Sequence, residues 1–134
     1  VMATKITVSN LRASYDFYTK AVGLKKIDIP GIPDPSLDNQ DVQFSEVCLN
    51  YSGSLADPYM CLMKQRGMTV ERDQAKLIWV ILKTQNARTA LSRVQAAGSQ
   101  LQGDVSEFRG VVMGRTHDPD GYTLLFIQSA GVRQ

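Results

Sequence analysis

The only histidine of this sequence, His117, is the first side chain to consider for catalysis. An imidazole changes its protonation state near neutral pH, so His117 could act as a general base. It precedes Asp118, Pro119, Asp120 and Gly121, a run that is typical of a tight turn. The alternative is that His117 only flanks this turn and hydrogen-bonds to Asp118.

Two further groups of side chains have the chemistry of metal ligands or reactive thiols. Cys48 and Cys61 are the only cysteines, which is too few for a disulfide framework. We expect two free thiols, buried as small hydrophobic residues in a reducing cytoplasm. A loop rich in Asp and Asn lacks the EF-hand spacing and its closing glutamate, so a solvated loop is favoured over a calcium site. The loop residues concerned are Asp34, Asp38, Asn39 and Asp41.

The composition is that of one ordinary globular domain. The chain has 134 residues, 43% hydrophobic and 21% charged, which is enough for a core without a metal or disulfide staple. A formal net charge of +2 argues against a dedicated nucleic-acid or membrane-surface binder. The longest apolar stretch, near residues 77–82, is far shorter than the roughly 20 residues that span a membrane, and no secretory signal is visible. We therefore expect a cytoplasmic protein with neither a nucleic-acid nor a membrane partner.

The elements that must position these side chains occur twice along the chain. In the first half we predict a strand, a helix between Asn10 and Gly23, and three further strands, over residues 4–9, 11–22, 24–29, 42–50 and 58–64. After a polar linker over residues 65–74, the same order recurs over residues 76–83, 87–97, 101–105, 110–116 and 122–128. Gly98 ends the second helix as Gly23 ends the first, and 98 − 23 = 75 residues separate them. This spacing favours an internal duplication over a chance coincidence of common patterns.

Several of these motifs resemble those of a known superfamily. The run ITVSNL at residues 6–11, followed by Phe17-Tyr18 and Gly23-Leu24, is similar to the opening of vicinal oxygen chelate proteins. The run DPDGY at residues 118–122, followed by an apolar strand, is similar to their closing hairpin. The superfamily includes glyoxalase I, extradiol dioxygenases, fosfomycin-modifying enzymes, and bleomycin- or mitomycin-resistance proteins.

The resemblance implies an α+β fold built from two βαβββ modules, at residues 3–64 and 75–129 of a single glyoxalase-like domain spanning residues 1–134. Each module would curl a mixed sheet, so that the pair encloses a U-shaped cleft. A homodimer is also implied, in agreement with the tendency of exposed sheet edges to pair. The sequence leaves open whether each cleft forms within one chain or between two.

Metal-dependent members of the superfamily place their ligands, usually His and Glu, on the first and fourth strand of each module. Carried over to this chain, the four positions fall on Ala3, at or next to Cys61, on Leu77 and on Leu125. Alanine and leucine offer no lone pair, and one cysteine alone cannot hold a divalent ion. We therefore expect no metal and no other cofactor, which puts glyoxalase, dioxygenase and thiol-transferase chemistry in doubt for this chain.

The implied cleft would be lined by alternate residues of its strands. The predicted lining consists of Lys5, Thr7, Tyr59, Cys61, Met63, Trp79, Ile81, Val112, Gly114, Thr123, Leu125 and Ile127. Trp79 and Tyr59 could stack on a planar ligand, and Lys5 could meet an anionic group. The alternative is that both aromatic residues fill core volume and that Lys5 reaches out to solvent.

Strand pairing decides on which side of the sheet His117 falls. A hairpin closed by Asp118 and Gly121 pairs His117 with Tyr122, and Gly114 with Leu125. His117 is then predicted on the opposite face from Leu125, away from the cleft.

The sequence thus predicts a glyoxalase-like protein without the usual metal ligands, which binds or sequesters a small aromatic or amphipathic molecule in an apolar cleft. Its predicted ligand-binding residues are Lys5, Thr7, Tyr59, Cys61, Met63, Trp79, Thr123 and Leu125. One alternative is a glyoxalase-family lyase or dioxygenase-like enzyme with an unusual metal site, or with a metal-free site at Lys5, Tyr59 or His117. Another is an interaction subunit whose cleft is filled.

Overall fold

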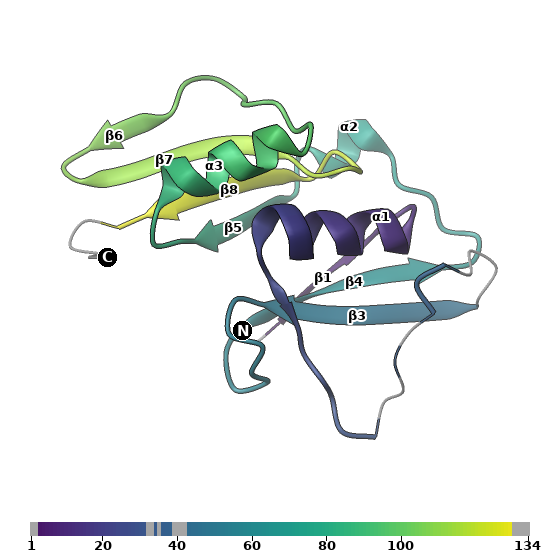
Figure 1. Ribbon diagram of the computed structural model, residues 1–134. Helices are drawn as coiled ribbons and strands as arrows, with labels where there is room; N and C mark the ends of the chain where they lie inside the picture. Colours follow the sequence, from purple (N-terminus) through teal and green to yellow (C-terminus); the bar gives the residue numbers. More distant parts are fainter. Residues whose placement is uncertain (1–2, 32–33, 35, 39–42, 130–134) are drawn as a thin grey trace. The chain divides into compact units, whose positions relative to one another are not determined.

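The computed structural model describes residues 3–31, 34, 36–38 and 43–129 (Figure 1). The chain divides into two units, Val1–Val70 and Glu71–Gln134, and each contains a strand, a helix and three further strands in that order. Each unit has its own four-stranded mixed sheet, so the predicted α+β class with a repeated βαβββ order is confirmed. None of the described helices is long and apolar enough to cross a membrane.

The first unit consists of one sheet with a helical segment over one face (Figure 1). Its strands are paired in the order β1-β4-β3-β2 and comprise β1 (Ala3–Thr7), β2 (Lys25–Lys26), β3 (Phe44–Asn50) and β4 (Tyr59–Gln65). The helical segment begins as α1 (Leu11–Asp16) and continues as the π-helical turns of η1 (Phe17–Val22). The Asn10 side chain caps it by accepting a hydrogen bond from the Ala13 N–H at 3.0 Å, and Gly23 ends it with φ 94°.

The core of the first unit lies between the helical segment and one face of the sheet. Ile6, Leu62 and Val47 are paired across β1, β4 and β3 and are all buried. Since successive strand residues point to opposite faces, the neighbouring row Lys5, Cys61 and Cys48 points away from this core.

The second unit repeats this arrangement. Its strands are paired in the order β5-β8-β7-β6 and comprise β5 (Trp79–Lys83), β6 (Ser106–Phe108), β7 (Val111–His117) and β8 (Thr123–Gln128). The short helix α2 (Arg72–Ala75) precedes β5, and α3 (Ala87–Ala96) follows it. Asn86 caps α3 through the Thr89 N–H at 3.0 Å, as Asn10 caps α1, and Gly98 follows the helix with φ 102°. The two capped strand–helix connections are the clearest trace of the repeat.

Some predicted boundaries need correction. The strand expected over residues 101–105 lies at Ser106–Phe108, and β2 is much shorter than the expected 24–29. The expected linker contains the start of α2, where Arg72 donates a hydrogen bond to the Pro119 carbonyl oxygen at 2.7 Å. Strand β5 begins only at Trp79, so Leu77 precedes the sheet and is 74% exposed. Leu77 is therefore not the strand position that the sequence predicted.

The hairpin between β7 and β8 differs from the predicted register by one residue. Asp118 to Gly121 form the expected turn, with the Gly121 N–H donating to the Asp118 carbonyl oxygen at 3.0 Å. Gly121, with φ 98°, then adds one bulged residue, because the Asp118 N–H bonds to the Tyr122 carbonyl oxygen at 3.0 Å. His117 consequently pairs with Thr123 rather than with Tyr122. The prediction that His117 lies on the opposite face from Leu125 is wrong, since both point to one side.

The same shift moves two predicted lining residues to the helix side. Gly114 pairs with Phe126, which is fully buried, and a Cβ atom at Gly114 would lie 2.5 Å from Leu91 Cδ1 of α3. Val112 is also buried and points to the same side as Gly114. Gly114 is thus a glycine because the helix approaches the strand too closely for a side chain.

Candidate functional site

Each sheet has one face that packs on its helix and one that does not, and we call the latter its open face. The first open face carries Lys5, Thr7, Glu46, Cys48, Tyr59, Cys61 and Met63. The second carries Trp79, Ile81, Lys83, Met113, Arg115, His117, Thr123, Leu125 and Ile127. All eight predicted ligand-binding residues lie on these faces, five on the first and three on the second. Their role in binding, and the cleft expected between the modules, stay predictions.

Lys5 on the first open face already has an anionic partner. Its Nζ lies 2.9 Å from Glu46 Oε2, and the two side chains are 56% and 21% exposed. The hydrogen bond and the negative charge of Glu46 raise the pKa of Lys5. A ligand anion at Lys5 would have to compete with this carboxylate.

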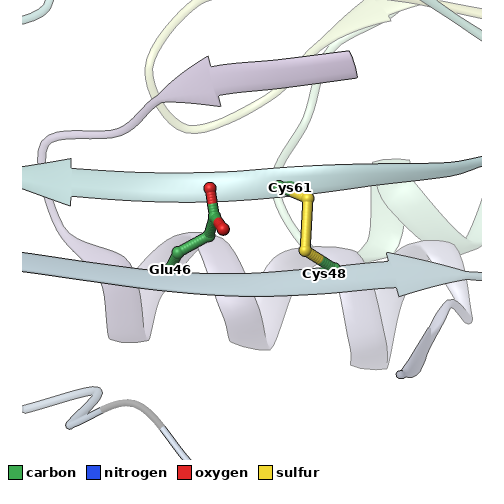
Figure 2. A group of neighbouring side chains, drawn as sticks. All are labelled: Glu46, Cys48 and Cys61. Atoms are coloured by element: carbon green, nitrogen blue, oxygen red, sulfur yellow. A yellow bond between two sulfur atoms is a disulfide. The ribbon is translucent and has the colours of Figure 1, made fainter. Parts of the chain in front are cut away.

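The two cysteines form a disulfide, so the prediction of free thiols is wrong (Figure 2). Cys48 and Cys61 are directly opposite each other on β3 and β4, with 4.0 Å between their Cα atoms. This pairing depends on the strand register, which the local sequence pattern does not reveal. Because disulfides are rare in reducing compartments, the expected cytoplasmic location loses the support that it drew from free thiols. Ile27 is buried against the disulfide, and Ile29 and Tyr59 pack against this cluster.

Three of the four positions carried over from metal-dependent relatives, all except Cys61, do not fit a metal ion. Ala3 and Leu125 offer no ligand atom, and Leu77 lies outside the sheet. By pairing, the second-module counterpart of Ala3 is Trp79, since Ala3 pairs with Tyr59 as Trp79 pairs with Thr123. An indole does not bind divalent ions either. No step of a reaction is therefore assigned to a metal at these four positions.

A different group on the first open face does have ligand chemistry. Among the described residues, Glu46, Cys48 and Cys61 bring one carboxylate oxygen and two sulfur atoms within 4.8 Å of one another. Figure 2 shows Glu46 and Cys48 on the same strand, with Cys61 on the strand beside it. Sequence reasoning missed Glu46, although its spacing of two residues from Cys48 on a strand signals a shared face.

The two described carboxylates of the acidic loop, Asp34 and Asp38, are engaged in ion pairs. Asp38 accepts two hydrogen bonds from the Arg12 guanidinium, both 3.0 Å long, and these hold the pKa of Asp38 below its usual range. Asp34 pairs with Lys26. Asn39 and Asp41 lie outside the described residues. The described part of the loop thus agrees with the solvated alternative.

One hollow borders this loop on the helix side of the first sheet. Its volume is about 180 Å³, and its lining consists of Tyr15, Lys26, Asp34, Leu37 and Val47. Ligand pockets for small organic molecules usually measure about 300–1,000 Å³. The Lys26 ammonium that borders it is engaged by Asp28 and Asp34. This hollow is therefore a poorer candidate site than the open faces.

The second open face is centred on the only tryptophan of the chain. Trp79 is 47% exposed, and the guanidinium carbon of Arg115 lies 5.4 Å from the centroid of its ring system. Ile81 beside it is 64% exposed, and Leu125 is half-buried. An aromatic ring held under a guanidinium and flanked by aliphatic side chains can bind a flat organic group.

His117 completes this face, in the same row as Trp79 and Thr123. Partial burial is the main cause that lowers the pKa of His117, and the positive charges of Arg72, Arg115 and Lys76 lower it further. Its imidazole is therefore neutral at neutral pH and can accept a proton or a hydrogen bond. Thr123 is 5% exposed, and its hydroxyl donates to the Lys76 carbonyl oxygen at 2.6 Å. This hydrogen bond ties β8 to the segment before β5, and a role of Thr123 in ligand binding stays a prediction.

The chain is similar to known proteins in fold, but only distantly similar in sequence. No protein-family model matches the chain. Lactoylglutathione lyase from Escherichia coli O157:H7 is 22% identical over 130 residues, which cover 96% of this chain and 91% of the relative.

Among solved structures, a mutant of glyoxalase I from Zea mays aligns with a TM-score of 0.70 and 17% identity. The alignment covers 96% of this chain but 44% of the maize chain, so the chain spans less than half of that protein. TnmS3, an antibiotic binding protein from Streptomyces sp. CB03234, aligns with a TM-score of 0.70 and 19% identity, covering 97% of this chain and 95% of the other. At these identities the likeness defines the fold.

Proposed function

The chain has the glyoxalase-like fold of the vicinal oxygen chelate superfamily, as its motifs indicated, and from this premise we propose that it binds a small planar organic anion at Trp79. The observation that carries the proposal is the half-exposed Trp79 ring beneath the Arg115 guanidinium. The ligand stacks on the indole and places its negative charge beside Arg115 and His117.

Stacking supplies the shape preference of this site. An exposed indole flanked by Ile81 and Leu125 favours a flat, apolar body over a branched or saturated one. Ring-on-ring contact of this kind contributes about 0.5–1.5 kcal/mol beyond simple burial of area. Trp79 therefore makes the largest single contribution to affinity.

Charge supplies the preference for an anion. Among the described side chains of the second open face, Arg115 and Lys83 are cationic and none is a carboxylate. His117 has three cationic neighbours, Arg72, Arg115 and Lys76. A planar guanidinium can donate two parallel hydrogen bonds to a carboxylate, which a lysine cannot do.

Binding without chemistry is the simplest activity of such a face. TnmS3, which shares this fold, is an antibiotic binding protein. Three of the four carried-over ligand positions, Ala3, Leu77 and Leu125, lack an atom that could hold a metal, and the metal is the Lewis acid of the superfamily's enzymes. Homodimerisation remains part of the proposal as the superfamily resemblance implies it.

One observation favours an enzyme as the second candidate. The neutral imidazole of His117 lies on the same face as Trp79, where it could accept a proton from a bound molecule. Such an enzyme would act without a metal. Its activity would be lost in His117→Gln while ligand affinity stayed within a few fold, whereas a pure binder shows no turnover in either protein.

Calorimetric titration of the full chain with three probes tests the proposal. The probes are 1-naphthoate, a planar anion; 1-naphthylmethylammonium, a planar cation; and cyclohexanecarboxylate, a saturated anion. We expect 1-naphthoate to bind at least about tenfold more tightly than either of the others, because only it satisfies both Trp79 and Arg115. Equal affinity for all three would contradict the proposal.

Two variants locate the binding. Trp79→Ala and Arg115→Gln should each weaken naphthoate binding by about tenfold or more. The matched control is Arg88→Gln, because Arg88 is an exposed arginine of α3 that pairs with Glu107. Unchanged affinity in both test variants would mean that the ligand binds elsewhere.

A further inference from the structure

We propose that the first open face contains a redox-gated metal site, in which Glu46, Cys48 and Cys61 bind a zinc ion once the Cys48–Cys61 disulfide is reduced. The proposal is independent of the organic ligand site, which lies on the other sheet. It uses none of the positions at which metal-dependent relatives carry His or Glu except Cys61.

The sheet holds the three ligands in place without help from the disulfide. Strands β3 and β4 are paired from Phe44 opposite Gln65 to Leu49 opposite Met60, so the cysteines stay opposite each other after reduction. Glu46 lies two residues before Cys48 and points to the same face. The three ligand atoms already lie within 4.8 Å of one another, so a side-chain rotation suffices to surround an ion.

The donor set suits zinc. Two thiolates and one carboxylate provide three protein ligands, and a water molecule can take the fourth tetrahedral position. Thiolates also favour zinc over magnesium or calcium, which prefer all-oxygen sites. While the disulfide is intact neither sulfur is a thiolate, and the donor set is incomplete.

The gating step is a two-electron reduction. A dithiol reductant gives two electrons and two protons to the disulfide, the sulfur–sulfur bond breaks, and the products are two cysteine thiols and the reductant's own disulfide. Zinc binding then displaces the two thiol protons to solvent. In the reverse step a small-molecule disulfide takes two electrons from the two thiolates and becomes two thiols, the sulfur–sulfur bond re-forms and the ion is released.

Two further residues, Lys5 and Ile27, lie beside the proposed ligands. Lys5 pairs with Cys61 in the sheet register, and its ammonium lies 2.9 Å from Glu46 Oε2. A nearby ammonium favours the thiolate form of a cysteine. Because the Lys5 side chain is 56% exposed, it can turn to solvent when the ion takes over Glu46. Ile27 is buried in one cluster with the two cysteines, which are 4% and 1% exposed, so it must shift to admit the fourth ligand.

Cobalt titration of the full chain tests the proposal directly. One sample is reduced with the phosphine TCEP, where disulfide, phosphine and water give two thiols and a phosphine oxide; the other is kept oxidised. Co²⁺ takes the place of zinc as a coloured probe. We expect one equivalent to bind to the reduced chain, with a sulfur-to-cobalt charge-transfer band in the near ultraviolet. The oxidised chain should show no such band.

Variants assign the ligands. Cys48→Ser should abolish the band. Glu46→Gln should keep the band but weaken cobalt affinity by at least about tenfold, because losing even a residue that only hydrogen-bonds to a metal ligand has an effect of that size. Glu107→Gln is the matched control, since Glu107 is a strand glutamate of the other unit. Circular dichroism checks that each variant is folded, and zinc protection of the wild-type thiols from alkylation gives a readout that needs no variant.

Several results would overturn the proposal. These are an identical band in the oxidised chain, a reduced chain that binds cobalt without the band, and a Glu46→Gln variant that binds as tightly as the control. None of these results bears on naphthoate binding at Trp79, so the two proposals can fail separately.

Discussion

The two sheets have the same arrangement of strands and helix, but their open faces carry different kinds of side chain. On the first, Lys5 pairs with Glu46, and Cys48 is bonded to Cys61. On the second, Trp79 and Ile81 are 47% and 64% exposed. The first face satisfies its reactive groups internally, whereas the second leaves aromatic and aliphatic surface uncovered. A repeated fold thus fixes where side chains lie, and the side chains decide which copy can bind an organic molecule.

Equivalent positions make the difference specific. Lys5 opposite Cys61 in the first sheet corresponds to Ile81 opposite Leu125 in the second, where both side chains are aliphatic. Ala3 opposite Tyr59 corresponds to Trp79 opposite Thr123. At these corresponding positions, the large aromatic side chain therefore lies on the fourth strand in the first module and on the first strand in the second.

The largest predicted effect separates the two sides of the second sheet. Phe126 is fully buried under α3, and Phe126→Ala should lower the free energy of unfolding by about 3–5 kcal/mol because it leaves a cavity. Ile81→Ala on the open face should change it by no more than about 0.5 kcal/mol. Urea unfolding measures both. A large loss in Ile81→Ala would mean that another surface covers this face.

Reduction of the disulfide should affect the first sheet alone. The bond closes a loop with a sequence separation of 13 residues, so its loss should lower the unfolding free energy by about 3 kcal/mol, chiefly through the unfolded state. The far-ultraviolet circular dichroism should stay the same, because the strands remain paired. Unfolding curves with and without TCEP test this, and a loss of strand signal on reduction would contradict the sheet-held geometry.

Sequence reasoning recovered the elements because their signals are local. Asn10 and Asn86 cap their helices through their own side chains, and Gly23 and Gly98 follow the helices with positive φ. Such features need no knowledge of distant contacts, and the repeated order followed from them.

The registers were harder to predict because they depend on single residues in turns and on distant pairing. One bulged glycine, Gly121, was enough to bring His117 onto the face of Trp79. The disulfide required knowing that Cys48 lies directly opposite Cys61 on paired strands. Glu46 entered the site for the same reason. The residues missed are therefore those whose placement follows from pairing rather than from local pattern.

Gly114 offers a direct test of the corrected register. Gly114→Ala should lower the unfolding free energy by about 1–3 kcal/mol, because its Cβ would meet Leu91 at 2.5 Å. Arg115→Ala, one residue along the same strand but on the open face, should change stability by no more than about 0.5 kcal/mol. Thermal or urea unfolding compares them. If Gly114→Ala left the unfolding free energy unchanged, the result would favour the register predicted from the sequence, in which Gly114 faces away from α3.

The smallest predicted effect concerns the pH dependence at His117. Because its pKa is lowered from the ordinary 6.5, the unfolded chain takes up a proton first as the pH falls below 6.5. Stability contributed by the neutral imidazole is therefore present above pH 6.5 and is lost as the pH falls through the lowered, folded-state value. NMR titration of the imidazole measures this pKa, and Arg115→Gln should raise it. An unshifted pKa in both proteins would contradict the cationic surroundings of His117.

The most direct test of the central claim is a map of ¹H–¹⁵N chemical-shift changes on adding 1-naphthoate to the labelled chain. We predict saturable shifts at the Trp79 indole N–H and at the amides of Arg115 and His117, with none around Lys5 and Glu46. Shifts confined to the first sheet, or no saturable shift at Trp79, would contradict the account.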